Sequence, residues 1–157
     1  MLEPRRLGAL AYRDHLMEVG LRALVLDFGG VLTDPGDHPE PGLEPPLLTA
    51  ARTAKRHGVR TAILSNADGL WAPPMAWQDV FDVVVTSGEV GFAKPDRRIY
   101  LVVAERLGLD PSHCVFVDDL AVNVRGAAAV GMVGVHHRSV NATVGELEVL
   151  LDLPLQD

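Results

Sequence analysis

The sequence from residue 24 to residue 34 reads Leu-Val-Leu-Asp-Phe-Gly-Gly-Val-Leu-Thr-Asp. It begins as an apolar run of the kind that forms a buried central strand of a parallel sheet. The run ends in the carboxylate of Asp27 and two glycines, which allow the backbone to turn sharply. Ligands of open α/β sheets bind just beyond the carboxyl ends of the strands, so Asp27 stands where a functional residue would lie. Asp and Gly are also common in ordinary turns, and this stretch alone favours a turn without a functional role.

The composition is that of one globular domain. The chain has 157 residues, of which 48% are apolar and 22% are charged. The formal net charge is −7, and no segment is basic enough to predict a nucleic-acid interface. The only cysteine is Cys114, which excludes an intramolecular disulfide and agrees with a reducing, cytoplasmic location. No run approaches the roughly 20 apolar residues that span a membrane.

Apolar runs and helical patterns alternate along the chain. This alternation predicts an α/β fold: a three-layer, Rossmann-like parallel sheet of about five strands with helices on both faces. We divide the sequence into an N-terminal helical extension, residues 1–20, and a core domain, residues 21–157. Strands are expected at residues 22–27, 59–64, 81–85, 114–117 and 132–136. Helices are expected from Pro46 to the stop at Gly58, from Pro95 to Leu107, at residues 121–130, and from the Thr143/Glu146 capping pattern to just before Pro154.

Two stretches lack such a pattern. Residues 33–46 are dense in proline and glycine, which excludes a helix or a central strand and predicts a loop. Residues 71–77 carry Trp71 and Trp77 in a weakly helical context. The simpler interpretation of these tryptophans is local core packing. The alternative is an aromatic anchor that forms a homodimer contact or shields a substrate.

The expected strands end in groups that can bind a ligand. Asp27 closes the first strand, Ser-Asn at 65–66 the second, and Asp-Asp at 118–119 the fourth, while Lys94 lies in the loop after the third. Because the ends of parallel strands share one edge of the sheet, three carboxylates and one ammonium group are expected to converge. Clustered carboxylates need a cation, and oxygen ligands suit Mg²⁺. A hydroxyl, an amide and a lysine beside that ion would suit a phosphoryl group.

These strand ends resemble the four motifs of the haloacid dehalogenase-like hydrolase superfamily, in the order that the family uses, over residues 22–151. Each motif is weak alone, but four in order at strand ends are a specific signal. The motifs are Asp-Phe-Gly-Gly-Val-Leu-Thr at 27–33, Ile-Leu-Ser-Asn at 63–66, Gly-Phe-Ala-Lys-Pro-Asp at 91–96 and Val-Phe-Val-Asp-Asp at 115–119.

The resemblance implies roles for the catalytic residues. Asp27 would be the nucleophile that forms an aspartyl-phosphate, which divides hydrolysis into two easier steps. Ser65 and Asn66 would bind the phosphoryl group, and Lys94 would neutralise both that group and Asp27. Taken singly, each residue is better explained as a helix cap or a surface residue. Taken together, those explanations require four independent coincidences.

The same resemblance implies a Mg²⁺ site. The carboxylate of Asp27, the carbonyl of Gly29 and the carboxylate of Asp119 would bind the ion directly. Asp118 would act largely through water. Asn123, one helical turn after Asp119, would support these ligands.

Two features depart from the family pattern. Most of its phosphatases carry a second Asp, two residues after the nucleophile, as general acid and base, and Gly29 occupies that position here. Activity is therefore expected to be low or to depend on good leaving groups. The segments between the motifs are also too short to hold the cap domain of the family. The site is therefore expected to be open, which suits a bulky substrate and excludes water poorly.

The sequence thus predicts a Mg²⁺-dependent phosphatase that acts on a phosphorylated small molecule or a bulky phosphorylated substrate. The alternative is a catalytically weak or inactive module of the same fold that binds a partner, which Gly29 favours. Carbon–halogen hydrolysis also uses an aspartate nucleophile. It needs no metal, however, and leaves the acidic pair at 118–119 unexplained.

Overall fold

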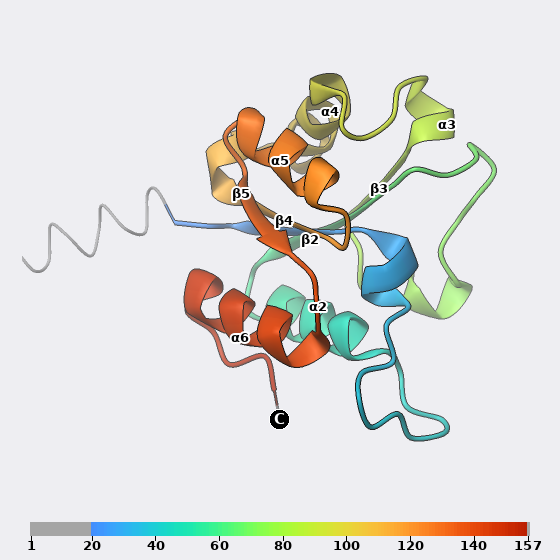
Figure 1. The fold of residues 1–157 in the computed structure, drawn as a ribbon, viewed down its shortest axis with the longest axis vertical. Coiled ribbons are helices and arrows are strands. Elements are labelled where there is room, and N and C mark those ends of the chain that lie inside the picture. The colour runs from blue at the N-terminus through green and yellow to red at the C-terminus, as the bar shows by residue number, and fades with distance from the viewer. Residues whose placement is uncertain (1–19, 157) are drawn as a thin grey trace, which may run out of the picture.

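The computed structural model describes residues 20–156, which form a parallel sheet of five strands with helices on both faces (Figure 1). The order in the sheet is β3-β2-β1-β4-β5, which places β1 at the centre. This is the predicted α/β fold, and each strand lies within two residues of its predicted position. The strands are β1 (Ala23–Leu26), β2 (Arg60–Ser65), β3 (Val83–Thr86), β4 (Cys114–Asp118) and β5 (Val133–His136).

The central strand β1 is covered on both faces. Leu24 and Leu26 belong to one hydrophobic cluster and Ala23 and Val25 to another, and all four side chains are fully buried. Successive side chains of a strand point to opposite faces, so a strand covered on both sides requires an unbroken apolar run. β1 pairs with β2 on one side and with β4 on the other. The residue that follows β1, Asp27, is therefore held at the middle of the sheet edge.

Two longer helices cover each face of the sheet (Figure 1). α2 (Pro46–Arg56) and α6 (Val140–Leu151) pack on one face, and α4 (Arg97–Leu107) and α5 (Ala121–Ala129) pack on the other. A further short helix, α3 (Ser87–Val90), is absent from the sequence-based prediction. It is a single turn capped by the hydroxyl of Thr86. Shorter elements in the connections are η1 (Phe28–Leu32), η2 (Met75–Trp77), α3 (Ser87–Val90) and η3 (Pro111–His113).

Helix α4 starts later than predicted. Asp96 is its N-cap, and Asp96 Oδ1 accepts a hydrogen bond of 2.9 Å from the backbone N–H of Arg98. Pro95, predicted in the first turn, therefore precedes the cap. The end of the helix agrees with the prediction, because Gly108 adopts a φ of 72° there.

Helix α6 starts earlier than predicted, at Val140. Ser139 caps it and accepts a hydrogen bond from the backbone three residues on. Thr143, the predicted cap, is buried inside the helix, where its hydroxyl lies 2.7 Å from Nδ1 of His137. The other ring nitrogen of His137 lies 2.7 Å from Asp34 Oδ2. These contacts tie the start of α6 to the loop that follows η1.

Three sequence-based predictions can be compared with the structure only within residues 20–156. The predicted N-terminal helix at residues 1–20 lies outside it, apart from residue 20. Within residues 20–156 no cap domain is inserted, since only η1, a loop and α2 separate β1 from β2, and only η2 separates β2 from β3. No helix within residues 20–156 is long and apolar enough to cross a bilayer.

A close backbone crossing anchors the loop after β2. The N–H of Ala67 donates to the Ser87 hydroxyl at 2.9 Å, and that hydroxyl donates to the carbonyl of Ala67 at 3.1 Å. The N–H of Gly88 donates to the same carbonyl at 2.8 Å. A Cβ on residue 88 would overlap the backbone of Gly69 and Asp68. Position 88 is therefore restricted to glycine by the close approach of two backbones.

We expect Gly88→Ala to lower the free energy of unfolding by about 1–3 kcal/mol, because the overlapping backbone atoms cannot turn away. Gly145→Ala, within α6, is the matched control, since its Cβ would meet nothing within 4 Å. Replacing a glycine inside a helix should raise stability by about 0.5–1 kcal/mol. Urea unfolding of both variants measures the difference. Equal stability of Gly88→Ala and the wild type would contradict a tight crossing.

Candidate active site

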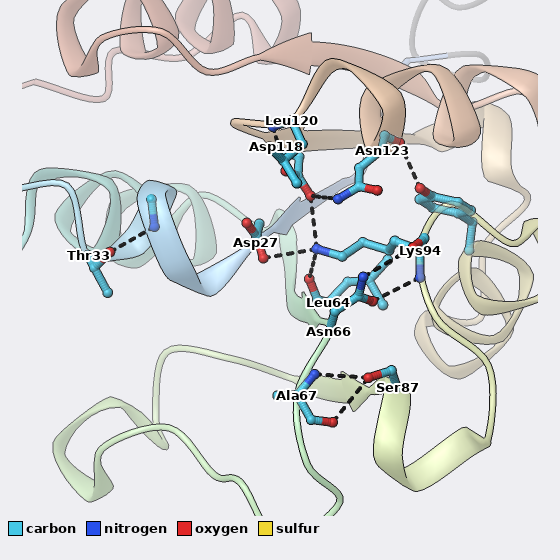
Figure 2. Close-up of polar contacts among 12 residues, drawn as sticks. Asp27, Thr33, Leu64, Asn66, Ala67, Ser87, Lys94, Asp118, Leu120 and Asn123 are labelled. Atoms are coloured by element: carbon cyan, nitrogen blue, oxygen red, sulfur yellow. Dashed lines mark hydrogen bonds and ion pairs between the residues drawn. The ribbon is translucent and has the colours of Figure 1, made fainter.

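A buried lysine joins three of the strand ends (Figure 2). Lys94 Nζ donates hydrogen bonds of 2.9 Å to Asp27 Oδ1, to Asp118 Oδ2 and to the carbonyl of Leu64. These acceptors stand at the ends of β1, β4 and β2. The three protons of the ammonium group are therefore all donated to protein oxygens. The structure brings Asp27, Asp118 and Lys94 together as the sequence predicts.

The backbone of Lys94 is held by the side chain of Asn66 (Figure 2). Asn66 Oδ1 accepts from the N–H of Lys94 at 2.8 Å, and Nδ2 donates to the Lys94 carbonyl at 3.1 Å. The structure thus gives Asn66 a positioning contact that the sequence does not reveal. Binding of substrate by Asn66 stays a prediction.

A second set of contacts fixes Asp118. Its Oδ1 accepts from the N–H of Leu120 at 2.9 Å, and its Oδ2 accepts from Asn123 Nδ2 at 3.2 Å. The hydroxyl of Tyr100 donates to the carbonyl of Asn123 at 2.7 Å, which fixes the start of α5. The contact of Asn123 fits its predicted supporting role. The part played by Tyr100 was missed, because in the sequence Tyr100 looks like one more core residue of α4.

Three carboxylates meet at the sheet edge. Oxygens of Asp27, Asp118 and Asp119 lie within 4.8 Å of one another. Asp118 is fully buried and bound to Lys94, whereas Asp119 is exposed. Its carboxylate makes no hydrogen bond or ion pair with any residue of the described chain. Asp119 is therefore free to bind a cation or water.

The two glycines after Asp27 serve different purposes. Gly30 has a φ of 83°, and a Cβ there would overlap the carboxylate of Asp119. Position 30 is thus restricted to glycine both by its backbone conformation and by the approach of Asp119. Gly29 has a φ of −68° and a ψ of 125°, which any residue adopts, and a Cβ there would meet nothing within 4 Å. The absence of a side chain at position 29 is therefore not imposed by the fold.

A pocket of 390 Å³ opens over these groups. Ser65, at the end of β2, lines it, and the Ser65 hydroxyl makes no hydrogen bond within residues 20–156. That hydroxyl is available to a ligand. The pocket is lined by Asp27, Phe28, Gly29, Ser65, Asn66, Ala67, Trp71, Lys94, Asp119, Leu120 and Asn123. All predicted site residues except the buried Asp118 therefore face one space.

Aromatic side chains flank this pocket. The ring of Phe28 lies 4.7 Å from that of Trp71 in an edge-on arrangement and 5.8 Å from that of Trp77. All three pack against the hydrophobic cluster under α2 and α6. Local packing therefore accounts for both tryptophans, and Trp71 also lines the pocket. A homodimer contact stays a prediction.

The surroundings of Asp27 favour its neutral form. Burial raises the pKa of this carboxyl from 3.8 to about 6, although the charge and hydrogen bond of Lys94 act in the opposite direction. The negative charge of Asp118 also contributes to the raised pKa of Asp27. Ionised Asp27 is partly desolvated and therefore lowers the stability of the folded protein. Such a perturbed carboxyl group is typical of functional sites.

Comparison with known proteins identifies the family of this site. The model of the haloacid dehalogenase-like hydrolases matches residues 37–131, which include Ser65, Lys94 and Asp119. The chain belongs to the haloacid dehalogenase-like hydrolase family. The motifs noted in the sequence are those of this family, and Asp27 precedes the matched region.

Relatives of this hydrolase include curated and solved proteins. It is 38% identical over 93 residues to Phosphatase MT3486 of Mycobacterium tuberculosis, covering 56% of this chain and 43% of that protein. It is 38% identical over 115 residues to mouse acyl-CoA dehydrogenase family member 10, covering 70% of this chain and 11% of that protein. The chain thus spans less than half the length of either relative. The crystal structure of an uncharacterized Corynebacterium glutamicum protein superimposes with a TM-score of 0.71 and 37% identity, covering 85% of this chain and 97% of that one.

We expect Asp27→Asn to raise the melting temperature of the metal-free protein by a few degrees at pH 8, by about half as much at pH 5 and by little at pH 4. The pKa of Asp27 is raised by folding, so stability from its protonated form is complete below pH 4 and is lost as the pH rises through about 6. Asn avoids this loss and still offers an oxygen to Lys94.

Thermal unfolding in EDTA across this pH range tests the expectation. The exposed Asp37→Asn is the control and should show no such trend. A difference between Asp27→Asn and the wild type that stays constant with pH would contradict the raised pKa.

Proposed function

We propose that this hydrolase is a Mg²⁺-dependent phosphatase that acts through an aspartyl-phosphate on Asp27. The observation that carries the proposal is the grouping of Asp27, Lys94 and the unpaired Asp119 around one pocket, with a free serine hydroxyl on its wall. The name of its relative Phosphatase MT3486 supports the same reaction class.

The charges of the site fit a divalent cation. Three carboxylates face a single ammonium group, so the ionised site carries an excess of two negative charges and would repel a phosphate dianion. Asp27, Asp119 and the carbonyl of Gly29 would hold Mg²⁺, with Asp118 reaching it through water. The bound ion would offset the excess charge and polarise the phosphoryl group.

The residues of the chain divide the reaction between them. A carboxylate oxygen of Asp27 attacks phosphorus, and the bond from phosphorus to the leaving oxygen breaks. The Ser65 hydroxyl donates to a phosphoryl oxygen, and Lys94 keeps Asp27 in place. Water then attacks the same phosphorus, which breaks its bond to Asp27 and yields inorganic phosphate and the free carboxylate. The leaving oxygen gains a proton in the first step, and the attacking water loses one in the second. Gly29 offers no side chain for either transfer.

A binding module is the second candidate function. The observation that favours it is Gly29, because a positioned general acid and base contributes about 10²–10⁴-fold to such reactions. In this alternative the pocket holds a phosphorylated ligand without cleaving it. The two functions share their metal and anion contacts and differ only in turnover.

Phosphate release from a panel of phosphate esters, with and without Mg²⁺, decides between them. We expect turnover of acetyl phosphate and aryl phosphates that requires Mg²⁺ and is abolished in Asp27→Asn, because an amide is not a nucleophile. Asp37→Asn should retain full activity. Binding of Mg²⁺ by calorimetry without turnover of any ester would favour the binding module.

We expect Gly29→Asp to raise the hydrolysis of alkyl phosphates by tenfold or more and that of aryl phosphates much less, because only alkoxides need protonation to leave. The backbone at this position accepts a side chain, and the added Cβ meets nothing. Gly29→Asn is the matched control, with similar size and no acidic proton. Equal gains in both variants, or equal gains for both ester classes, would contradict a missing general acid.

A further inference from the structure

Exposed apolar side chains gather in two segments that each contribute to the lining of the pocket, residues 67–78 and residues 120–122, which we call the two flanks. Residues 67–78 follow the second motif and contain one charged residue, Asp68. Leu70 and Met75 in this segment are 94% and 83% exposed. On the other flank, Leu120 and Val122 are 54% and 46% exposed. Four of the seven large apolar side chains exposed in residues 20–156 thus lie in the two segments that border the pocket.

These flanks are continuous with the catalytic pocket. Trp71, which follows Leu70, lines the same space as Asp27, and so does Leu120. Trp71 is held edge-on against Phe28, and the ring of Trp77 also contacts that of Phe28 in a tilted arrangement. Packing on the core therefore fixes Trp71, which forms the apolar wall of the pocket together with Leu120, before any ligand binds. A ligand that uses it does not have to order a mobile loop.

The pocket offers little to a second polar group of a substrate. Among residues 20–156, Lys94 is the only basic residue that lines it, and the Lys94 ammonium is already bound by three oxygens. The other charged residues that line it are Asp27 and Asp119. In nucleotides and other esters with further anionic groups, the additional negative charge would find no basic side chain among these lining residues, because Lys94 and the proposed Mg²⁺ already serve the carboxylates and the reacting phosphoryl group.

We infer that the leaving group of the natural substrate is a large, uncharged, apolar alcohol or phenol that lies against Trp71 and Leu120. This inference rests on the proposed phosphatase activity and names the substrate class of the same site. Burial of the apolar part against this wall supplies binding energy in proportion to the area covered. An open, capless site admits such a group without a size limit set by a lid.

A series of 4-alkylphenyl phosphates, from methyl to hexyl, tests the inference. The alkyl chain changes the apolar surface and leaves the reactivity of the phenol nearly constant. We expect kcat/KM in Mg²⁺ to rise about two- to fourfold per methylene, mainly through KM, where fourfold corresponds to a fully buried methylene. The matching 4-alkylbenzylphosphonates, which cannot be hydrolysed, should show the same trend in Kd by calorimetry.

Two variants locate the apolar contact. Leu120→Ser and Trp71→Gln should flatten the dependence of kcat/KM on chain length, so that the methyl and hexyl esters differ by less than about twofold. Val149→Ser is the control, because Val149 is 81% exposed on α6, away from the pocket. Leu120→Ser keeps the N–H that binds Asp118, so it remains informative if Trp71→Gln is poorly folded.

The outcomes separate this inference from the proposed reaction. Turnover that is independent of chain length would overturn the apolar substrate and leave the phosphatase in place. Phosphonate binding that grows with chain length, without turnover of any ester, would overturn the phosphatase and leave the apolar ligand. A wild type that sediments as a dimer, becomes a monomer in Leu120→Ser and ignores chain length would assign the flanks to a second copy.

Discussion

The geometry of the site depends on one buried ammonium group. Lys94 Nζ binds the ends of three neighbouring strands at once, and each of its protons has an acceptor at 2.9 Å. A buried charge is tolerated only where it is paired and hydrogen-bonded, and Lys94 offsets part of the cost of burying Asp27 and Asp118. Asp119 is left outside this arrangement. Lys94 thus holds the strand ends together but does not pair with Asp119. The unpaired negative charge of Asp119 is the one that a cation would offset.

Much of this arrangement could be predicted because sheet topology is strongly patterned in sequence. The apolar run at residues 23–26 fixes a strand covered on both faces, and parallel strands bring Asp27, Ser65 and Asp118 to one edge without further information. Two features could not be predicted from the sequence. They are the hydrogen bond from Tyr100 to the carbonyl of Asn123 and the start of α6 at Val140. They depend on which side chains meet across the fold, and such partners leave no periodic trace in the sequence.

Trp71 and Trp77 show the same limit. Their spacing fits local packing, a dimer contact or a substrate wall equally well, because the choice depends on the path of a loop. The structure lays that loop beside η1, so that both rings meet Phe28, the residue that follows Asp27. The strand ends and the loop after β3 thus supply the carboxylates and the lysine of the pocket, and Ala67 and Trp71 of residues 67–78 supply part of its wall.

The two-sided anchoring of residues 67–78 has a consequence for how this fold can diversify. At one end the crossing of Ala67 with Ser87 and Gly88 ties the segment to the sheet, and at the other Trp77 rests on Phe28. Trp71 also rests on Phe28, and residues 72–76 between the two tryptophans take part in neither anchor. Lengthening a surface loop costs only about 0.6 kcal/mol of closure entropy per doubling. Evolution or an engineer could therefore insert new sequence there, from a few residues to a whole module, while Asp27 and Lys94 stay in register.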